Sequence, residues 1–286
     1  MNKKPVILVS GKNGQLGSEL ADIAANYGQF DFHFFDRDSL DIGDKDKLAA
    51  AFQQYHPAYF VNCAAYTAVD KAETEREKSL SINAKSPADI AVLCNEYGTR
   101  FIHISTDYVF NGEGKAPYNE YEPTQPVNYY GETKLLGEKA ALANNKDTVI
   151  IRTSWVYSRH GHNFVKTMIR LMKERPEIKV VSDQVGSPTH AADLAEAIMV
   201  IITNSEFVPG IYHFSNDGII SWYDFAVAIR DIKHLNSTVH PIPTSSYPTP
   251  AKRPAFSAMN KEKIISTYHV SLKHWKESLQ QCLDKL

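Results

Sequence analysis

The sequence predicts an α/β protein: a doubly wound parallel sheet with a smaller, C-terminal substrate-binding lobe. Short apolar runs alternate with amphipathic stretches through the first half of the 286-residue chain. A glycine-rich turn follows the first apolar run. Such alternation is typical of βαβ units, in which helices cover both faces of a parallel sheet.

The elements follow from this alternation in order. We predict strands at residues 6–9, 32–35, 59–62, 101–104 and 148–151. We predict helices at residues 45–55, 84–97, 163–173, 191–203 and 221–230. The dinucleotide-binding domain is expected at residues 1–155, joined by later segments from about 178 to 230, and the substrate lobe mainly at 156–286. Prolines crowd residues 241–254, which excludes a long helix and predicts an ordered, extended loop.

Composition excludes several classes of function. The formal net charge of −2 gives no basis for a nucleic acid or an anionic membrane as partner. No apolar run approaches the length of a membrane span, and the first residues show no export signal. Cys63, Cys94 and Cys282 are too few and too scattered for a disulfide framework or a metal site. We therefore expect a cytoplasmic protein.

A glycine-rich turn joins the first strand to the following helix. Gly11, Gly14 and Gly17 recur at three-residue spacing. Glycine permits a tight turn and the close approach of a pyrophosphate, which free N–H groups at the helix start then bind. Asp36 ends the second strand, about 20 residues further on, where a carboxylate binds the adenosine ribose. The pattern predicts a Rossmann-type dinucleotide site.

The choice between NADH and NADPH stays open at this point. Asp36 would repel a 2′-phosphate, whereas Arg37 and Lys12 would attract one. Small residues after the third strand, including Ala64 and Ala65, leave room for a flat ring or a sugar at the sheet edge.

A tyrosine and a lysine at helical spacing form the predicted proton donor. Tyr130 and Lys134 share one helix face. A nearby ammonium lowers the pKa of a tyrosine, which makes the phenol a proton donor to a developing alkoxide. The fourth strand leads into Ser105 and Thr106, and a hydroxyl there can orient a substrate carbonyl. Alternation along the strand sends these two side chains to opposite faces, so we expect only one to serve.

These residues together resemble the extended short-chain dehydrogenase/reductases, and longer strings look like the dTDP-4-dehydrorhamnose reductase family. The strings are NCAAYTAVDKAE at 62–73, STDYVF at 105–110, YGETKLLGE at 130–138, RTSWVY at 152–157 and PTPAKRP at 248–254. The resemblance covers nearly the whole chain. It implies an NAD(P)-dependent oxidoreductase that reduces the C4 ketone of dTDP-4-dehydro-β-L-rhamnose to dTDP-L-rhamnose, a precursor of bacterial surface polysaccharide.

The resemblance also implies roles for individual residues. Tyr130 is the proton donor, Lys134 tunes it and binds the nicotinamide ribose, and Thr106 polarises the ketone. The residues assigned to NADPH or NADH are Gly11, Asn13, Gly14, Gln15, Leu16, Gly17, Asp36, Arg37, Asp41, Ile42, Ala64, Ala65, Tyr66, Tyr130 and Lys134. Those assigned to the nucleotide sugar are Thr67, Val69, Thr106, Asp107, Tyr108, Trp155 and Arg253. The planar guanidinium of Arg253 is expected to bind the diphosphate through two parallel hydrogen bonds.

One departure from the family pattern and two alternatives accompany this interpretation. Some family members are dimers linked by a metal through glutamates; Glu19 matches one such position, but residues 191–193 offer no second glutamate. We therefore expect no metal and leave a homodimer open. His160 and His162 are expected to be exposed.

The alternative functions are a non-catalytic regulatory subunit of the methionine adenosyltransferase type and a nucleotide-sugar epimerase or dehydratase. The intact Thr106, Tyr130 and Lys134 argue against the first, and retention of a bound NAD would favour the second.

Overall fold

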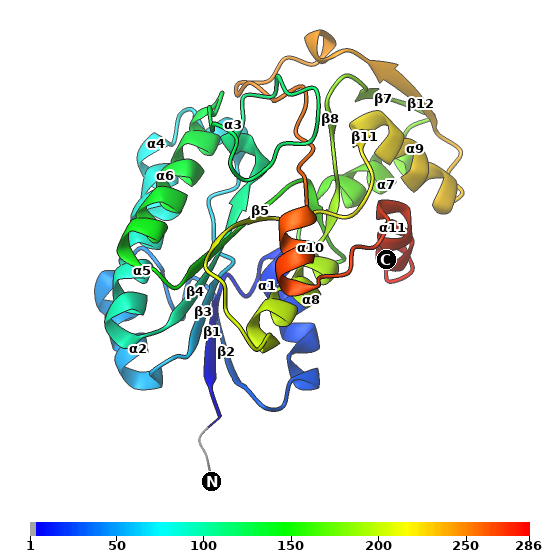
Figure 1. Ribbon diagram of the computed structural model, residues 1–286. Helices are drawn as coiled ribbons and strands as arrows, with labels where there is room; N and C mark the ends of the chain where they lie inside the picture. Colours follow the sequence, from blue (N-terminus) through cyan, green and yellow to red (C-terminus); the bar gives the residue numbers. More distant parts are fainter. Residues whose placement is uncertain (1–3) are drawn as a thin grey trace.

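The structure, a computed structural model, describes residues 4–286 and contains a six-stranded parallel sheet with helices on both faces (Figure 1). The strands lie in the order β10-β5-β4-β3-β1-β2. Their bounds are β1 Val6–Ser10, β2 Asp31–Phe35, β3 Tyr59–Asn62, β4 Arg100–Thr106, β5 Thr148–Thr153 and β10 Gly210–His213. The predicted doubly wound sheet is confirmed. Residues 1–3, part of the stretch considered for an export signal, lie outside the described residues.

The order of strands reverses at β1. β2 pairs with one edge of β1 and β3 with the other, so that Val9 lies between Phe34 and Val61. At such a reversal the loops leaving the two neighbouring strands diverge and open a crevice at the carboxyl ends. All five predicted strands are present. β10, which pairs with β5, is missing from the prediction because only Ile211 and Tyr212 lie between its glycine and its histidine, so no apolar run marks it.

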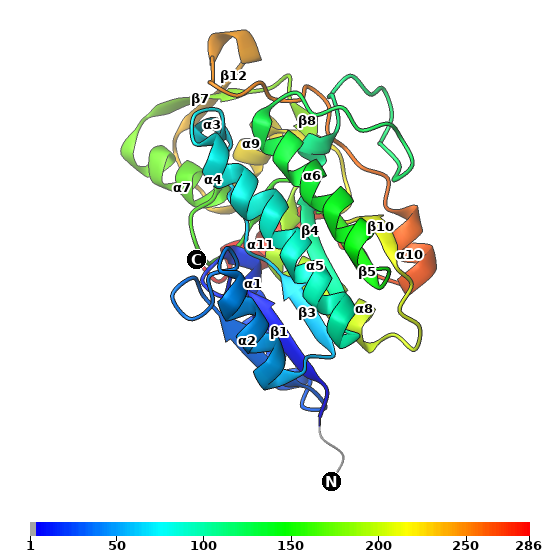
Figure 2. The same ribbon diagram turned by 90° about the vertical axis from the view of Figure 1, so that its left-hand side faces the viewer.

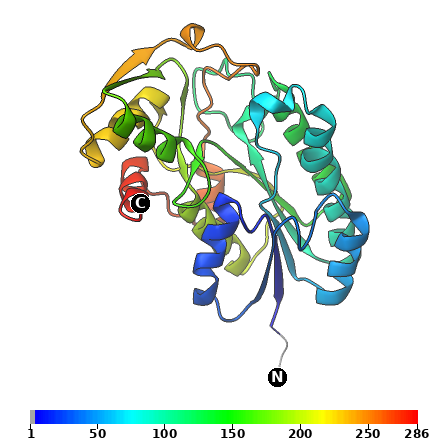
Figure 3. The same cartoon turned by 180° about the vertical axis from the view of Figure 1, so that it is seen from behind.

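Helices cover both faces of the sheet, as Figures 2 and 3 show from the side and from behind. The first face carries α2 Lys45–Tyr55, α5 Ser86–Tyr97 and α6 Tyr129–Asn144, and the second carries α1 Gln15–Ile23 and α8 Ala191–Thr203. Short turns of helix are η1 Ala24–Asn26, α3 Val69–Ala72, α4 Arg76–Leu80, η2 Ser81–Lys85 and η3 Asp107–Val109. β1 fills both cores by alternation: Ile7 and Val9 join one hydrophobic cluster, Val6 and Leu8 the other.

A further hydrophobic core lies beside the sheet in the C-terminal half. It is built by α7 Phe164–Glu174, β7 Glu177–Val181, α9 Trp222–Ile232, β12 Thr238–Ile242 and α11 Trp275–Leu283. The remaining elements are β6 Val156–Tyr157, β8 Val185–Gly186, β9 Thr189–His190, β11 Ile220–Ser221, η4 Thr244–Ser246 and α10 Glu262–Tyr268. The domain boundary at residue 155 stays a prediction. No helix in residues 4–286 is both long and apolar enough to cross a bilayer.

The start of the proline-rich stretch is a strand rather than a loop. β12 includes Pro241 and pairs in parallel with β7, opposite Val180. This two-stranded sheet consists only of edge strands, where a residue without an N–H is tolerated.

A buried ion pair fastens α6 to the sheet. The guanidinium of Arg152 on β5 donates two hydrogen bonds to the carboxylate of Glu138 on α6, over 2.9 and 2.7 Å. Ser105 on β4 donates a third hydrogen bond to the same carboxylate. Both charged side chains are almost fully buried. The pair therefore fixes the helix that contains Tyr130 and Lys134 against the strands beneath it.

Glu138→Gln should lower the free energy of unfolding by about 3–5 kcal/mol, because it leaves the charge of Arg152 buried without a counter-charge. Urea denaturation measures the change. Glu174→Gln is the matched control: it breaks an exposed pair with Arg170 and should cost less than about 1 kcal/mol. Equal, small losses in the two variants would contradict a structural role for the buried pair.

Candidate active site

The glycine turn after β1 is shaped by the close approach of backbone segments. Gly11 has a φ of +79°, and a Cβ there would lie 2.7 Å from the backbone nitrogen of Ala64. A Cβ at Gly17 would lie 2.3 Å from the carbonyl oxygen of Gly11. No side chain caps the N-terminus of α1, which leaves its first N–H groups available. The turn therefore fits a dinucleotide pyrophosphate, which needs a bare backbone and free N–H donors.

A crevice of about 950 Å³ opens at the carboxyl ends of the parallel strands. It is lined by most of the residues that we assigned: Gly11, Asn13, Gly14, Gln15, Leu16, Asp36, Arg37, Asp41, Ile42, Ala64, Ala65, Tyr66, Thr67, Val69, Thr106, Asp107, Tyr108, Tyr130, Lys134 and Trp155. Gly17 and Arg253 do not line it. Gly17 instead lies against the backbone of Gly11, and Arg253 is bound by an aspartate.

Charges of both signs gather where β2 ends. The Asp36 carboxylate accepts hydrogen bonds from the N–H and hydroxyl of Ser39 and from the amide of Asn13. These hydrogen bonds lower the pKa of Asp36, which keeps the carboxylate ionised. Arg37 lies close to the Asp41 carboxylate, 3.4 Å from Nε, and its side chain is mostly exposed. An acceptor for ribose hydroxyls and a cation for a phosphate thus lie next to each other.

The hydroxyls of Ser105 and Thr106 have different partners. Ser105 is bonded to the buried Glu138, whereas Thr106 donates to Asp107 over 3.0 Å and accepts from the N–H of Tyr108. The Ser105 hydroxyl is therefore engaged by the buried ion pair, which favours Thr106 as the hydroxyl available to a substrate. Thr106 and Tyr130 line the same crevice.

α6 holds Tyr130 and Lys134 on one buried face. The helix begins after Asn128, whose side chain accepts a hydrogen bond from the N–H of Gly131 over 2.8 Å. The Asn128 amide also donates to the carbonyl of Lys252, which ties the start of α6 to the proline-rich segment. Lys134 donates to the carbonyl of Ile104 over 2.6 Å.

The expectation of a lowered tyrosine pKa is wrong for the protein by itself. Burial raises the pKa of Tyr130 to about 12. Burial also lowers the pKa of Lys134 to about 8. Nζ of Lys134 is directed at a backbone carbonyl, and removal of both side chains from water decides the direction of both shifts. Tyr130 therefore holds its proton as a neutral acid.

Asp107 has one carboxylate oxygen without a partner. Oδ1 accepts from Thr106, whereas Oδ2 is buried and makes no hydrogen bond among the described residues. Burial raises the pKa of Asp107 to about 6, and the hydrogen bond from Thr106, which favours the ionised form, offsets this only in part. A buried, unpaired acceptor on the wall of a crevice is suited to a ligand hydroxyl.

Two tryptophans stack where the crevice meets the C-terminal core. The ring centroids of Trp155 and Trp222 lie 3.6 Å apart, with planes 13° from parallel. Trp155 has a φ of +49°, which is rare for a bulky residue and indicates a backbone held by its surroundings. Trp222 also lines the crevice, yet an aromatic residue at a helix start gives no signal of a site in the sequence.

Arg253 is engaged by a carboxylate rather than free. Its two terminal nitrogens donate to the two oxygens of Asp70 over 2.9 and 2.8 Å. Partial burial opposes ionisation of Asp70, but hydrogen bonds from Arg253 and from the N–H of Ala251 lower its pKa. Asp70 was not among the residues that we assigned, because no local pattern relates it to a residue so distant in sequence.

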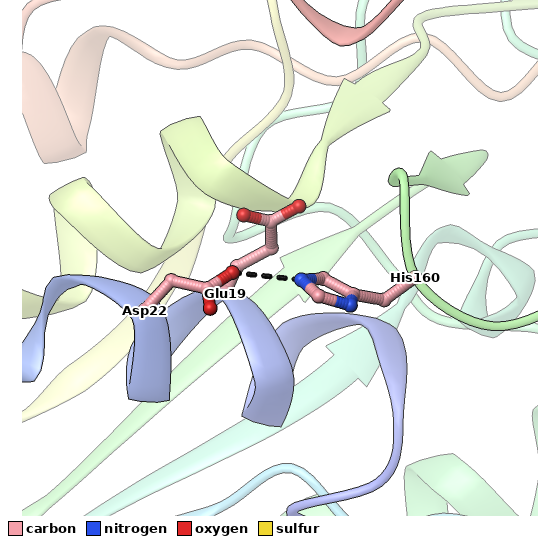
Figure 4. A group of neighbouring side chains, drawn as sticks. All are labelled: Glu19, Asp22 and His160. Carbon is pink, nitrogen blue, oxygen red and sulfur yellow. Dashed lines mark hydrogen bonds and ion pairs between the residues drawn. The ribbon is translucent and has the colours of Figure 1, made fainter. Parts of the chain in front are cut away.

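Figure 4 shows a cluster of Glu19, Asp22 and His160, whose ligand atoms lie within 4.8 Å of one another. The carboxylates already have partners: Ser158 donates to Glu19, and Arg159 and His160 contact Asp22, each over 2.7 Å. His160 is thus half-buried and paired, contrary to our expectation, whereas His162 is exposed. These contacts tie residues 158–160 to α1.

Comparisons with known proteins agree with this geometry. A family model described as RmlD substrate binding domain matches residues 5–286. The chain is 42% identical over 293 residues to dTDP-4-dehydrorhamnose reductase of Escherichia coli (strain K12), covering 98% of this chain and 97% of that protein. It is 40% identical over 279 residues to the spore coat polysaccharide biosynthesis protein SpsK of Bacillus subtilis (strain 168), with the same coverage.

A comparison of three-dimensional structures indicates the same family. The crystal structure of dTDP-4-dehydrorhamnose reductase from Bacillus anthracis in complex with NADP has a TM-score of 0.95 and 37% identity, covering 99% of this chain and all of that one. The resemblance found in the sequence is confirmed. This chain belongs to the dTDP-4-dehydrorhamnose reductase family, the family of the RmlD substrate binding domain.

Proposed function

We propose that this protein is a reductase that transfers a hydride from NADPH or NADH to the C4 ketone of dTDP-4-dehydro-β-L-rhamnose, giving dTDP-L-rhamnose. The supporting observation is one continuous crevice that contains the glycine turn, Thr106, Tyr130 and Lys134. Membership of the family supports the choice of substrate. The three cysteines are unpaired, which accords with the reducing cytoplasm where we propose that it acts.

The cofactor residues form the wall of the crevice at β1 and β2. We propose that the N–H groups at the start of α1 bind the pyrophosphate, Asp36 the adenosine ribose, and Lys134 the nicotinamide ribose. Asn13, Gln15, Leu16, Asp41, Ile42, Ala64, Ala65 and Tyr66 complete the assigned set. When bound, the reduced nicotinamide supplies the hydride.

The reaction needs a proton and an oriented ketone in addition to the hydride. Thr106 orients the carbonyl by a hydrogen bond to its oxygen. As negative charge develops on that oxygen, Tyr130 donates its phenolic proton, so that the oxygen–hydrogen bond of the tyrosine breaks and that of the product alcohol forms. The high pKa of Tyr130 keeps the proton on the phenol until the alkoxide, a stronger base, takes it.

The sugar and diphosphate lie beside this centre in our proposal. Thr67, Val69, Tyr108 and Trp155 surround the sugar, and the free Oδ2 of Asp107 accepts from one of its hydroxyls. Arg253 binds the diphosphate by exchanging the Asp70 carboxylate for phosphate oxygens, since either group offers two oxygens to the two parallel N–H donors of a guanidinium.

Tyr130→Phe should reduce turnover by roughly 100- to 10,000-fold, because general acid catalysis is lost, while cofactor and sugar binding persist. Oxidation of NADPH by a dTDP-4-keto sugar measures turnover. Tyr129→Phe is the control, since that neighbouring ring lies under Arg76 and outside the crevice. An undiminished rate in Tyr130→Phe would rule out this residue as the acid. If the wild-type protein consumes no NADPH, the result would favour a regulatory subunit. If the purified protein contains stoichiometric bound NAD, the result would favour an epimerase or dehydratase.

Both NADH and NADPH should support the reaction, with kcat/KM values that differ by less than about 1,000-fold. Asp36 favours a free ribose hydroxyl, Arg37 favours a 2′-phosphate, and solvent screens both exposed charges. Steady-state kinetics with each cofactor test this balance. Asp36→Asn should shift preference toward NADPH, and Arg37→Gln toward NADH; a larger preference in the wild type would contradict a balanced site.

Arg253→Ala should weaken nucleotide-sugar binding by roughly ten- to a hundredfold, because charge-assisted hydrogen bonds to the diphosphate are lost. Arg253→Lys should restore part of the affinity, since an ammonium lacks the planar fork. Asp70→Asn, which loosens the existing partner of Arg253, should not weaken sugar binding. Calorimetric titrations of dTDP-sugar and of NADPH separate the two sites. An equal loss of cofactor affinity would contradict the assignment to the diphosphate.

A further inference from the structure

A row of buried polar side chains crosses the sheet beneath the crevice and has no part in the mechanism described above. Ser10 on β1, Asn62 on β3 and His103 on β4 are neighbours in strand register and are fully buried. The row ends at Lys134 on α6, 3.4 Å from His103 Nε2. Polar groups in a dry sheet are costly unless each donor meets an acceptor, so their directions can be worked out.

A backbone amide fixes the direction of the first hydrogen bond. The N–H of Ala64 can only donate, and its acceptor is Asn62 Oδ1 at 3.2 Å. Ser10 donates to the same oxygen over 2.7 Å. The amide nitrogen of Asn62 must therefore face His103, where Nδ2 lies 3.1 Å from Nδ1. An amide nitrogen also can only donate, so Nδ1 of His103 is an acceptor and bears no proton.

The proton of the imidazole must then be on the other nitrogen. His103 is fully buried, and burial lowers its pKa well below the ordinary value. The ring is thus neutral and has a single proton, which the Asn62 contact places on Nε2. Nε2 is the nitrogen that faces Lys134, so the histidine presents a donor to the lysine.

A donor beside Lys134 favours the amine over the ammonium. An ammonium has three donors and no acceptor, so an opposing N–H repels it. A neutral amine can instead donate to the Ile104 carbonyl at 2.6 Å and accept from His103 with its lone pair. We propose that His103, held in one tautomer by Asn62 and the N–H of Ala64, is a positioning residue that favours the amine form of the catalytic Lys134.

The other groups around Lys134 do not cancel the effect of His103 on its protonation. Glu138, one turn further along α6, favours the ammonium, but its carboxylate is already bound to Arg152 from β5. Tyr130 on α6 and Asp107 on η3 line the same crevice as Lys134, and burial favours their neutral forms. Burial of Lys134 acts in the same direction as His103. Since Lys134 loses its proton as the pH rises, its charge would titrate just above neutral pH rather than stay fixed.

Long-range nitrogen–proton NMR of histidine-labelled protein tests the tautomer directly, with His103 assigned by its loss in His103→Phe. We expect a proton on Nε2 and none on Nδ1 at neutral pH. A proton on Nδ1, or an imidazolium, would overturn the proposal. The spectra need neither cofactor nor sugar, so this result is independent of the reductase assignment on which the role of Lys134 rests.

Titration of labelled lysine side chains tests the effect on Lys134. Asn62→Asp should turn the imidazole donor toward the carboxylate and raise the pKa of Lys134 by roughly one pH unit or more. Asn62→Leu, which frees the tautomer without adding charge, should raise it in the same direction. Ser10→Ala is the matched control and should change nothing, because Ala64 still orients Asn62. A shift in Asn62→Asp without one in Asn62→Leu would show an effect of charge alone and refute the tautomer mechanism.

Discussion

The contact between the backbones of Gly11 and Ala64 is the constraint on which the site depends. The ends of β1 and β3 meet there without an intervening side chain, and the strand order reverses at the same place. A side chain at Gly11 would push apart the two strand ends that form the floor of the crevice. The N–H of Ala64 also donates to the side chain of Asn62, so the residue that packs against Gly11 orients the buried polar row as well.

β4 relates the catalytic helix to the sheet through two of its side chains. His103 and Ser105, two residues apart, meet Lys134 and Glu138, which are one turn apart on α6. The strand and helix periodicities thus match over this contact. The carboxylate of Glu138 is bound from β4 and β5 together, which leaves little freedom for α6 to slide. Catalytic groups held in this way need little rearrangement during a reaction.

Side-chain contacts join the C-terminal half of the chain to the segments around the crevice. Trp222 stacks on Trp155, and Asn163 donates to Gln15 at the start of α1 over 2.9 Å. Arg253 binds Asp70, which follows β3 in the chain. Each contact joins segments far apart in the chain. The far wall of the crevice therefore depends on how the two cores are placed, in addition to the local turn after β1.

The sequence by itself determined the doubly wound sheet, the glycine turn and the pairing of Tyr130 with Lys134, because periodicity and short spacings are local properties. It also contained the strings that identify the family. Only the tertiary structure decided that Ser105 rather than Thr106 binds the buried ion pair, that Asp70 holds Arg253, and that burial raises rather than lowers the tyrosine pKa. Partners, burial and tautomers are set by residues distant in the chain, and no local pattern records which of them will meet.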